Sequence, residues 1–235
     1  MNNKYLRALK AAFPNTVPIL AGFLFLGITY GVLMRAAGFN YLYSTFISIT
    51  TFAGAMQYLA IAILQGAFNP LSVFLMTLLV NARHIFYGIS MLDNYKSAGK
   101  KGIYMIFAMC DESFSVNYSA TIPSGVDKGW FMFFVALLIH IYWVVGSALG
   151  GIFGSFITFN TKGMDFVLTA MFIVIFINNW QKEKNHISSV IGVFATLFWL
   201  LVVGSEYFLI PSLASIIIIL LVMQKRIESE VDNND

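Results

Sequence analysis

Charge is scarce in this sequence, and its scarcity excludes an ordinary soluble domain. Asp, Glu, Lys and Arg make up 11% of the 235 residues, whereas soluble domains carry about 25%. Hydrophobic residues reach 59% and the mean hydropathy is +0.79, with apolar runs of about 20 residues recurring along the chain. The composition therefore predicts an all-α fold: a polytopic integral membrane helix bundle with about six to eight apolar segments.

Cysteine and metal-ligand patterns are also nearly absent. The single cysteine, Cys110, lies in an apolar run, where we interpret it as a small buried hydrophobe. One cysteine excludes an internal disulfide and a cysteine-rich metal site, and neither an H-E-x-x-H spacing nor a nucleophile–base pair is evident. We therefore expect no metal, no cofactor and no enzyme activity. The net charge of +3 is small, which argues against a nucleic-acid partner.

Three segments follow from the distribution of polar residues. Residues 1–15 form a basic N-terminal segment, which the positive-inside rule places in the cytoplasm. We expect residues 16–224 to form the transmembrane domain and residues 225–235 to form a polar acidic tail that is solvated and disordered. The first apolar run is too long for a signal peptide and lacks a small-residue cleavage pattern, so we expect a retained helix.

The apolar runs are Val17 to Met34, Tyr41 to Leu64, Leu71 to Leu92, Gly102 to Ala120, Gly129 to Phe159, Asp165 to Trp180, His186 to Gly204 and Tyr207 to Met223. Pro14 and Pro18 should flank the start of the first helix, where a missing N–H is tolerated. Gly22, Gly27 and Gly31 in this helix either allow close helix approach or pack as ordinary small residues, and we favour ordinary packing.

Runs two and five are expected to be broken or re-entrant. Run two contains TFAGAMQ, Thr51 to Gln57. This stretch predicts either a break with free N–H groups at Gly54, or a continuous helix in which Gln57 makes one interhelical hydrogen bond. Run five is too long for one crossing and has a glycine-rich centre, Gly146 to Gly154. All four basic segments can be cytoplasmic only if both runs enter and leave on one side. The segments are residues 1–15, 96–101, 182–184 and 225–226.

Two polar stretches interrupt apolar runs three and four. Run three carries NARHIFYG, from Asn81 to Gly88, and run four carries Asp111, Glu112 and Ser113. Charged residues inside membrane segments usually face the protein interior or a watery cavity and mark a transport path. We expect the two stretches to meet and to form the working part of the protein.

Arg83 and Asp111 are equally distant from the turn between runs three and four. Each lies fourteen positions from Ser97, so an antiparallel hairpin places both at similar depth. A buried charge needs a partner, which for Arg83 is Asp111 or, with a modest rotation, Glu112. Neighbouring helical residues point about 100° apart, so one carboxyl is left for another partner or for a proton.

His84 is the neighbouring group that titrates near neutral pH. Together with a spare carboxyl it resembles a proton relay, with His84, Asp111 and Glu112 as candidates for proton coupling. The alternative is a structural ion pair beside a His84 that hydrogen-bonds a carbonyl. His140 and His186 are interpreted as packing or interface residues.

A cation, spare acids and apolar surroundings suit a hydrophobic zwitterion. Its carboxylate would meet Arg83 or the free N–H groups at Gly54, and its ammonium would meet Asp111 or Glu112. Asn81 and Gln57 complete the predicted substrate or translocation residues. A channel or a purely structural core could use the same residue types.

The first half of the chain resembles the AzlC family, the large subunits of AzlC/AzlD-type branched-chain amino acid exporters, which include YgaZ/YgaH and BrnF/BrnE. The resemblance runs from about Phe13 through Phe114. Its residues are FP at Phe13, YG at Tyr30, FAGAMQ from Phe52, NARHIFYG from Asn81 and DESF from Asp111. The second half is similar mainly in length and hydropathy, so its residues receive no role.

The resemblance implies export of branched-chain amino acids, and in some members methionine, across the cytoplasmic membrane. It also implies a small AzlD-type membrane subunit as partner, in a multi-pass carrier whose intramembrane acids favour proton coupling. The alternatives are a channel-like or ABC-type permease for another zwitterion, and a membrane-complex scaffold. The absence of a Walker motif does not decide between them, because ABC permeases bind a separate ATPase.

Overall fold

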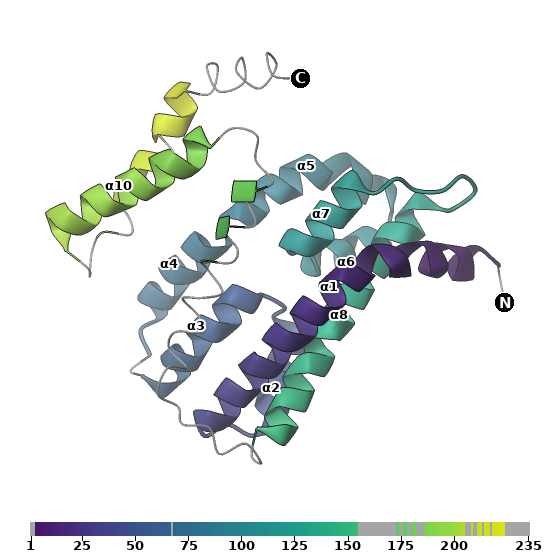
Figure 1. Ribbon diagram of the computed structural model, residues 1–235, viewed down its shortest axis with the longest axis horizontal. Helices are drawn as coiled ribbons and strands as arrows, with labels where there is room; N and C mark the ends of the chain where they lie inside the picture. Colours follow the sequence, from purple (N-terminus) through teal and green to yellow (C-terminus); the bar gives the residue numbers. More distant parts are fainter. Residues whose placement is uncertain are drawn as a thin grey trace. The chain divides into compact units, whose positions relative to one another are not determined.

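The computed structural model describes residues 3–66 and 68–154, then 173, 176–177, 180–181, 186–204, 208, 211–212, 214–216 and 218–223 (Figure 1). The chain divides into two compact units, Met1–Met164 and Asp165–Asp235, each considered by itself. Every regular element in the described residues is a helix, as the composition predicted.

The helices of the first unit are α1 (Asn3–Ala36), α2 (Tyr41–Thr50), α3 (Gly54–Gln65), α4 (Pro70–Asn81), α5 (Arg83–Ser97), α6 (Lys101–Phe107), α7 (Asp111–Ser119) and α8 (Lys128–Phe153). In the second unit, α10 (Ile187–Val203) coincides with the predicted seventh run. The sixth run, the loop at Lys182–Lys184 and the acidic tail fall largely or wholly outside the described residues.

α1 and α8 form a parallel pair that runs the length of the first unit (Figure 1). Lys4 Nζ and Asp127 Oδ2 make an ion pair of 2.8 Å where the two helices begin. The hydroxyls of Thr16 and Tyr142 lie 3.0 Å apart further along. Both helices are long and apolar enough to span a membrane. We call the end where they begin the basic end, and the other the opposite end.

Glycines let α1 and α8 touch backbone to backbone. A Cβ on Gly27 would lie 2.9 Å from Trp143 O, and one on Gly31 would lie 2.5 Å from the Gly151 nitrogen. Gly22 has nothing within 4 Å. Gly27 and Gly31 therefore allow α1 and α8 to approach closely, and their interpretation as ordinary packing residues is wrong.

The expected break in run five is wrong. α8 continues through the glycine-rich centre as far as Phe153, because its glycines pack against α1 rather than ending the helix. Pro14 and Pro18 also do not mark a helix start, since α1 already begins at Asn3 and runs through both. The Asn15 and Thr16 side chains donate hydrogen bonds to helix carbonyls in this stretch.

Run two is broken and re-entrant, which decides between the two alternatives. α2 starts at the opposite end, where Ser44 Oγ donates to Ser147 O of α8. The helix stops at Thr50, and Phe52 adopts a positive φ of 34°. α3 then returns to the opposite end, where Gln65 Nε2 donates to Ala37 O. Run two therefore enters and leaves at one end, as predicted.

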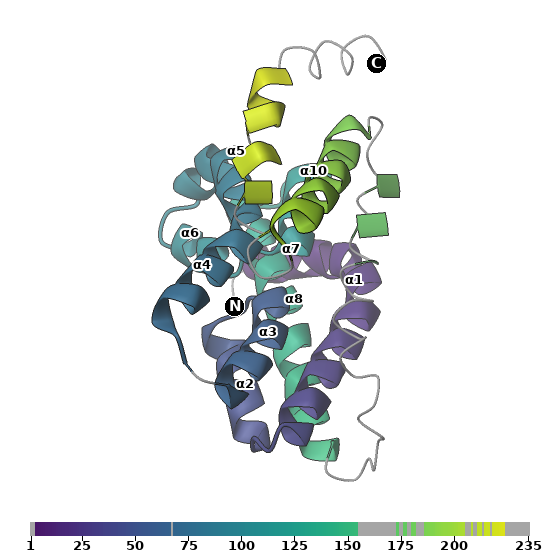
Figure 2. The same ribbon diagram turned by 90° about the vertical axis from the view of Figure 1, so that its left-hand side faces the viewer.

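Run four is a second re-entrant hairpin, which the sequence did not predict. α6 starts at the basic end, where Lys101 Nζ lies 4.9 Å from the ring centre of Trp130. The helix stops at Phe107, and α7 returns to that end. There Asn117 Nδ2 donates to Tyr95 Oη, and a second contact joins it to Met132 O of α8. In Figure 2, α2 and α3 lie in the lower part of the first unit and α5, α6 and α7 in its upper part.

α4 and α5 together run from the opposite end to the basic end. α4 follows α3 at the opposite end, and near the end of α5 Asn94 accepts a hydrogen bond of 2.7 Å from Lys128. Run three is interrupted at Ala82 between the two helices. In the described residues of the first unit, the helices thus break in runs two, three and four.

Basic residues gather at one end of the first unit. Seven lie at the basic end, whereas the opposite end has Arg35 among the described residues. The seven are Lys4, Arg7, Lys10, Lys96, Lys100, Lys101 and Lys128. Hydrogen bonds from the Lys4 ammonium and from the Trp130 N–H lower the pKa of the Asp127 carboxyl.

The glycine contacts predict a matched pair of stability effects. Gly31→Ala should lower the free energy of unfolding by about 1–3 kcal/mol, because the new methyl group meets rigid α8 backbone. Gly22→Ala adds the same methyl group where nothing lies within 4 Å and should not destabilise the protein. Thermal unfolding in detergent measures both variants. Equal stability of the two would contradict the proposed close contact.

Candidate functional site

Arg83 and Asp111 meet where α5 and α7 begin. Arg83 Nε lies 3.0 Å from Asp111 Oδ1, which confirms the pairing predicted from their equal distances to Ser97. The two side chains are 34% and 26% exposed. The two paired atoms are themselves buried, and neither makes a geometrically aligned hydrogen bond within the described chain. The contact is therefore an ion pair without an aligned hydrogen bond between its two paired atoms.

The break in run three places Arg83 at a helix start. Asn81 O accepts a hydrogen bond of 3.1 Å from His84 Nδ1, which must carry the proton because a carbonyl can only accept. The Ile85 N–H, which in a continuous helix would donate to Asn81 O, donates to Ala82 O. The Asn81 Nδ2 donates to Thr77 O. A side chain inserted into the backbone ladder is an ordinary cause of a helix kink.

His84 thus has the structural contact that was one of its two predicted roles. The contact leaves the other ring nitrogen, Nε2, for a different partner. A part in proton coupling stays a prediction, as does the part of Asn81 in binding substrate.

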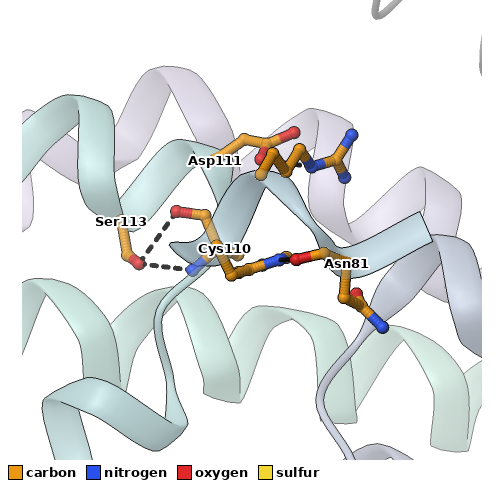
Figure 3. Close-up of polar contacts among 6 residues, drawn as sticks. Asn81, Cys110, Asp111 and Ser113 are labelled. Carbon is orange, nitrogen blue, oxygen red and sulfur yellow. Dashed lines mark hydrogen bonds and ion pairs between the residues drawn. The ribbon is translucent and has the colours of Figure 1, made fainter. Parts of the chain in front are cut away.

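The break in run four is closed by Ser113. Its Oγ accepts a hydrogen bond of 2.9 Å from the Cys110 N–H (Figure 3). The same Oγ lies 3.0 Å from Ala108 O. Cys110 occupies the N-cap position of α7, and Asp111 and Glu112 occupy its first turn. Carboxylates are favoured there by the positive end of the helix dipole. Capping therefore fixes the position from which Asp111 reaches Arg83.

Glu112 is the carboxyl left over from the ion pair. It follows Asp111 directly and makes no ion pair with a residue that the structure describes. Behind the acids, Tyr87 and Phe114 stack with ring centres 4.3 Å apart, which packs α5 against α7. The site accordingly offers a paired and an unpaired carboxyl beside one guanidinium.

Gly54 and Gln57 lie at the break in run two. Gly54 begins α3, and no side chain caps this helix start, so its first N–H groups lack helical partners. The Gly54 backbone packs against the Trp143 ring, which would lie 3.2 Å from an added Cβ. Gln57 is buried. Its Oε1 accepts a hydrogen bond of 2.6 Å from Trp143 Nε1, and its Nε2 donates a hydrogen bond to Ser48 Oγ. Gln57 thus fastens the hairpin to α8, and its role towards a substrate stays a prediction.

His140 proves more central than its sequence context indicated. It lies at an interface, as one of the two interpretations held, but this interface joins both re-entrant hairpins. Its Nε2 lies 3.1 Å from Ser48 O of α2, and its Nδ1 lies 2.8 Å from Tyr104 Oη of α6. The signal was a histidine within an otherwise apolar run. His186 packs, as interpreted, with its ring stacked 4.0 Å from that of Trp180.

The site brings charged groups of both signs together. Arg83 can hold an anionic group, and the two acids can hold a cationic one, with mostly apolar helices around them. The described residues contain no group of three His, Cys, Asp or Glu side chains that could hold a metal ion. This combination fits a small molecule that carries both charges.

The ion pair predicts non-additive effects on stability. Arg83→Gln or Asp111→Asn alone leaves a partly buried charge without its partner, so each should cost about 1–3 kcal/mol, less than for a fully buried pair. The double variant removes both charges and should be more stable than the sum of the single costs implies. Thermal unfolding of the four proteins gives the coupling energy; strict additivity would show that the two charges do not interact.

The family model described as "AzlC protein" matches residues 18–157 of the chain. The branched-chain amino acid transport protein AzlC of Bacillus subtilis (strain 168) is 55% identical over 221 residues, covering 94% of this chain and 87% of the relative. An uncharacterized membrane protein of Haemophilus influenzae (strain ATCC 51907 / DSM 11121 / KW20 / Rd) is 49% identical, covering 99% and 96%.

A more distant relative is the inner membrane protein YgaZ of Escherichia coli (strain K12), 23% identical over 73% of each chain. No solved structure matches the chain. The matched segment contains all three helix breaks and the Arg83–Asp111 pair. Together with its all-helical apolar fold, these matches show that the chain is a membrane protein of the AzlC family.

Proposed function

We propose that this chain exports branched-chain amino acids, and also methionine, as the large subunit of a two-component carrier. The observation that carries the proposal is the Arg83–Asp111 ion pair between two helix starts, with Glu112 beside it. The relative from Bacillus subtilis, named a branched-chain amino acid transport protein, supports the substrate class.

Substrate recognition follows from the charges of an amino acid. The substrate carboxylate replaces Asp111 at Arg83, or binds the uncapped N–H groups of α3 at Gly54. The ammonium binds Asp111 or Glu112, and apolar side chains surround the aliphatic part. Exchange of partners at Arg83 lets the empty site keep its charge paired, which limits the cost of an unpaired buried charge.

Proton coupling is assigned to the acids and to His84. Glu112 lacks an ion-pair partner among the described residues, and the His84 ring has one nitrogen free of the Asn81 contact. A carboxyl that binds either a proton or the substrate ammonium couples the two movements. The energy source would then be the proton gradient rather than ATP.

The basic end is assigned to the cytoplasm of a multi-pass protein in the cytoplasmic membrane. Seven basic residues lie at that end and Arg35 at the other in the described first unit, the asymmetry that the positive-inside rule associates with cytoplasmic loops. The N-terminus is then cytoplasmic. The partner is a small AzlD-type membrane subunit.

Efflux of labelled leucine or valine from cells loaded with dipeptide tests the function. The chain and its small partner are compared with the same pair carrying Asp111→Asn. Loss of a charged hydrogen-bonding group should lower efflux roughly tenfold to a hundredfold. An uncoupler added to the unmutated pair should abolish efflux as well.

Asp93→Asn is the matched control, because it removes an exposed carboxyl from α5 outside the site. It should leave efflux unchanged at equal membrane abundance. Unchanged efflux in Asp111→Asn would remove Asp111 from the mechanism, and efflux that follows ATP instead of the proton gradient would favour an ABC-type permease. A pair that assembles but exports no leucine or valine would contradict the proposed function.

A further inference from the structure

We propose that α1–α3 and α4–α7 are inverted copies of one unit, whose re-entrant hairpins approach the proposed site from opposite membrane faces. We assign His140 of α8 as the positioning residue that joins the two hairpin tips. The inference rests on the proposed function and deepens it, because the two hairpins are the elements that would open the transport pathway first to one membrane face and then to the other.

The sequence repeats at a spacing of 57 residues. Residues 28–34 of α1 read ITYGVLM, and residues 85–91 of α5 read IFYGISM. Four of the seven positions are identical, and a fifth pairs Val with Ile. The identical pairs are Ile28 and Ile85, Tyr30 and Tyr87, Gly31 and Gly88, and Met34 and Met91.

The helix breaks repeat at the same spacing. α2 ends at Thr50 and α6 ends at Phe107, which are 57 positions apart. α3 begins at Gly54 and α7 begins at Asp111, again 57 positions apart. The local packing is similar, with partners displaced by one position: Tyr30 contacts Tyr58 of α3, and Tyr87 stacks on Phe114 of α7.

The two copies run in opposite directions. α1 runs from the basic end to the opposite end, and its hairpin α2–α3 enters from the opposite end. α4 and α5 run back to the basic end, and their hairpin α6–α7 enters from there. Inverted repeats with broken helices are a common way to build a pathway that opens to each membrane face in turn.

α8 contacts the two hairpins along its two halves. Met132 and Phe133 in its first half touch α7 and α6, whereas Trp143 and Ser147 in its second half touch α3 and α2. His140 lies between these halves and is buried. It is therefore placed where the two hairpin tips come together.

The imidazole of His140 bonds one group from each hairpin. Nε2 must donate to Ser48 O, because a carbonyl can only accept, and a neutral ring then accepts at Nδ1 from Tyr104 Oη. The rings of Phe52 and Phe107, at the two tips, lie 4.5 Å and 5.6 Å from the imidazole. Breaking the Tyr104 hydrogen bond would loosen the second tip, whereas the first tip stays fastened to α8 through Gln57 and Ser48.

Cysteine labelling tests the inverted topology. In a Cys110→Ser background, single cysteines replace Asn40 and Phe68, which flank α2–α3, and Ser97 and Ser124, which flank α6–α7. A membrane-impermeant maleimide should label the first two from one face and the other two from the opposite face. Labelling of either flanking pair from two different faces would overturn the repeat.

Tyr104→Phe tests the role of His140, because it removes only the hydroxyl that bonds Nδ1. The matched control is Tyr142→Phe, which removes a hydroxyl paired with Thr16 between α1 and α8. Cys110 lies at the second tip, so its rate of reaction with N-ethylmaleimide in membranes reports release of that tip. Tyr104→Phe should raise the rate by up to about tenfold, the effect of one hydrogen bond, and the control should not.

Conservative replacement separates positioning from general packing. His140→Asn keeps an acceptor near the Nδ1 position and should restore slow labelling of Cys110, whereas His140→Ala should not. A merely structural role would instead lower the unfolding temperature of Tyr104→Phe and Tyr142→Phe alike. Equal labelling rates in these two variants would overturn the assignment. Neither labelling experiment needs a substrate, so both decide the inference even if the pair exports no branched-chain amino acid.

Discussion

The structure depends on partners for the backbone groups that are freed at three helix breaks in its described residues. A backbone N–H or C=O inside an apolar unit needs a partner, and a helix break frees several of them. Ser113 satisfies the break before α7, and His84 fills the one between α4 and α5. At the first hairpin, His140 donates a hydrogen bond to Ser48 O and so pairs a carbonyl near the break. Ser113, His84 and His140 are therefore polar residues that hold the backbone in place. Arg83, Asp111 and Glu112 do not have this role.

The Arg83–Asp111 pair was the most predictable part of the site. Its prediction needed only the rise of a helix, a turn near Ser97 and the cost of an unpaired charge. It holds although Arg83 and Asp111 each lie next to a break. The break at Ala82 lies beyond Arg83 as seen from that turn, and the break before Asp111 comes only after α6 has run to Phe107, so Asp111 begins α7 at the hairpin tip. The cost of an unpaired charge and the equal spacing together identified the two residues, although their helices are broken and were expected to be continuous.

The breaks themselves were predicted only in part, because glycine has two opposite uses. In run two the TFAGAMQ stretch marks a real reversal, where Phe52 takes a positive φ beside His140. In α8 the same residue type serves close packing against α1, so the helix continues. Only the partner helix distinguishes these uses. Run four breaks without glycine or proline at Ala108–Cys110. The capping contact between Cys110 and Ser113 does not follow the usual Ser/Thr-x-x-Glu/Gln pattern, so no local signal in the sequence marks this break.

The two hairpins share a backbone plan but differ in charge. The positions that begin α3 and α7 correspond in the repeat, yet one helix starts with Gly54 and Ala55 and the other with Asp111 and Glu112. The first start presents bare N–H groups with a partial positive charge, and the second presents carboxylates. An amino acid has this same polarity, with one negative and one positive end. Backbone symmetry would then supply two routes of access, while the difference in charge fixes the direction in which the substrate lies between the tips.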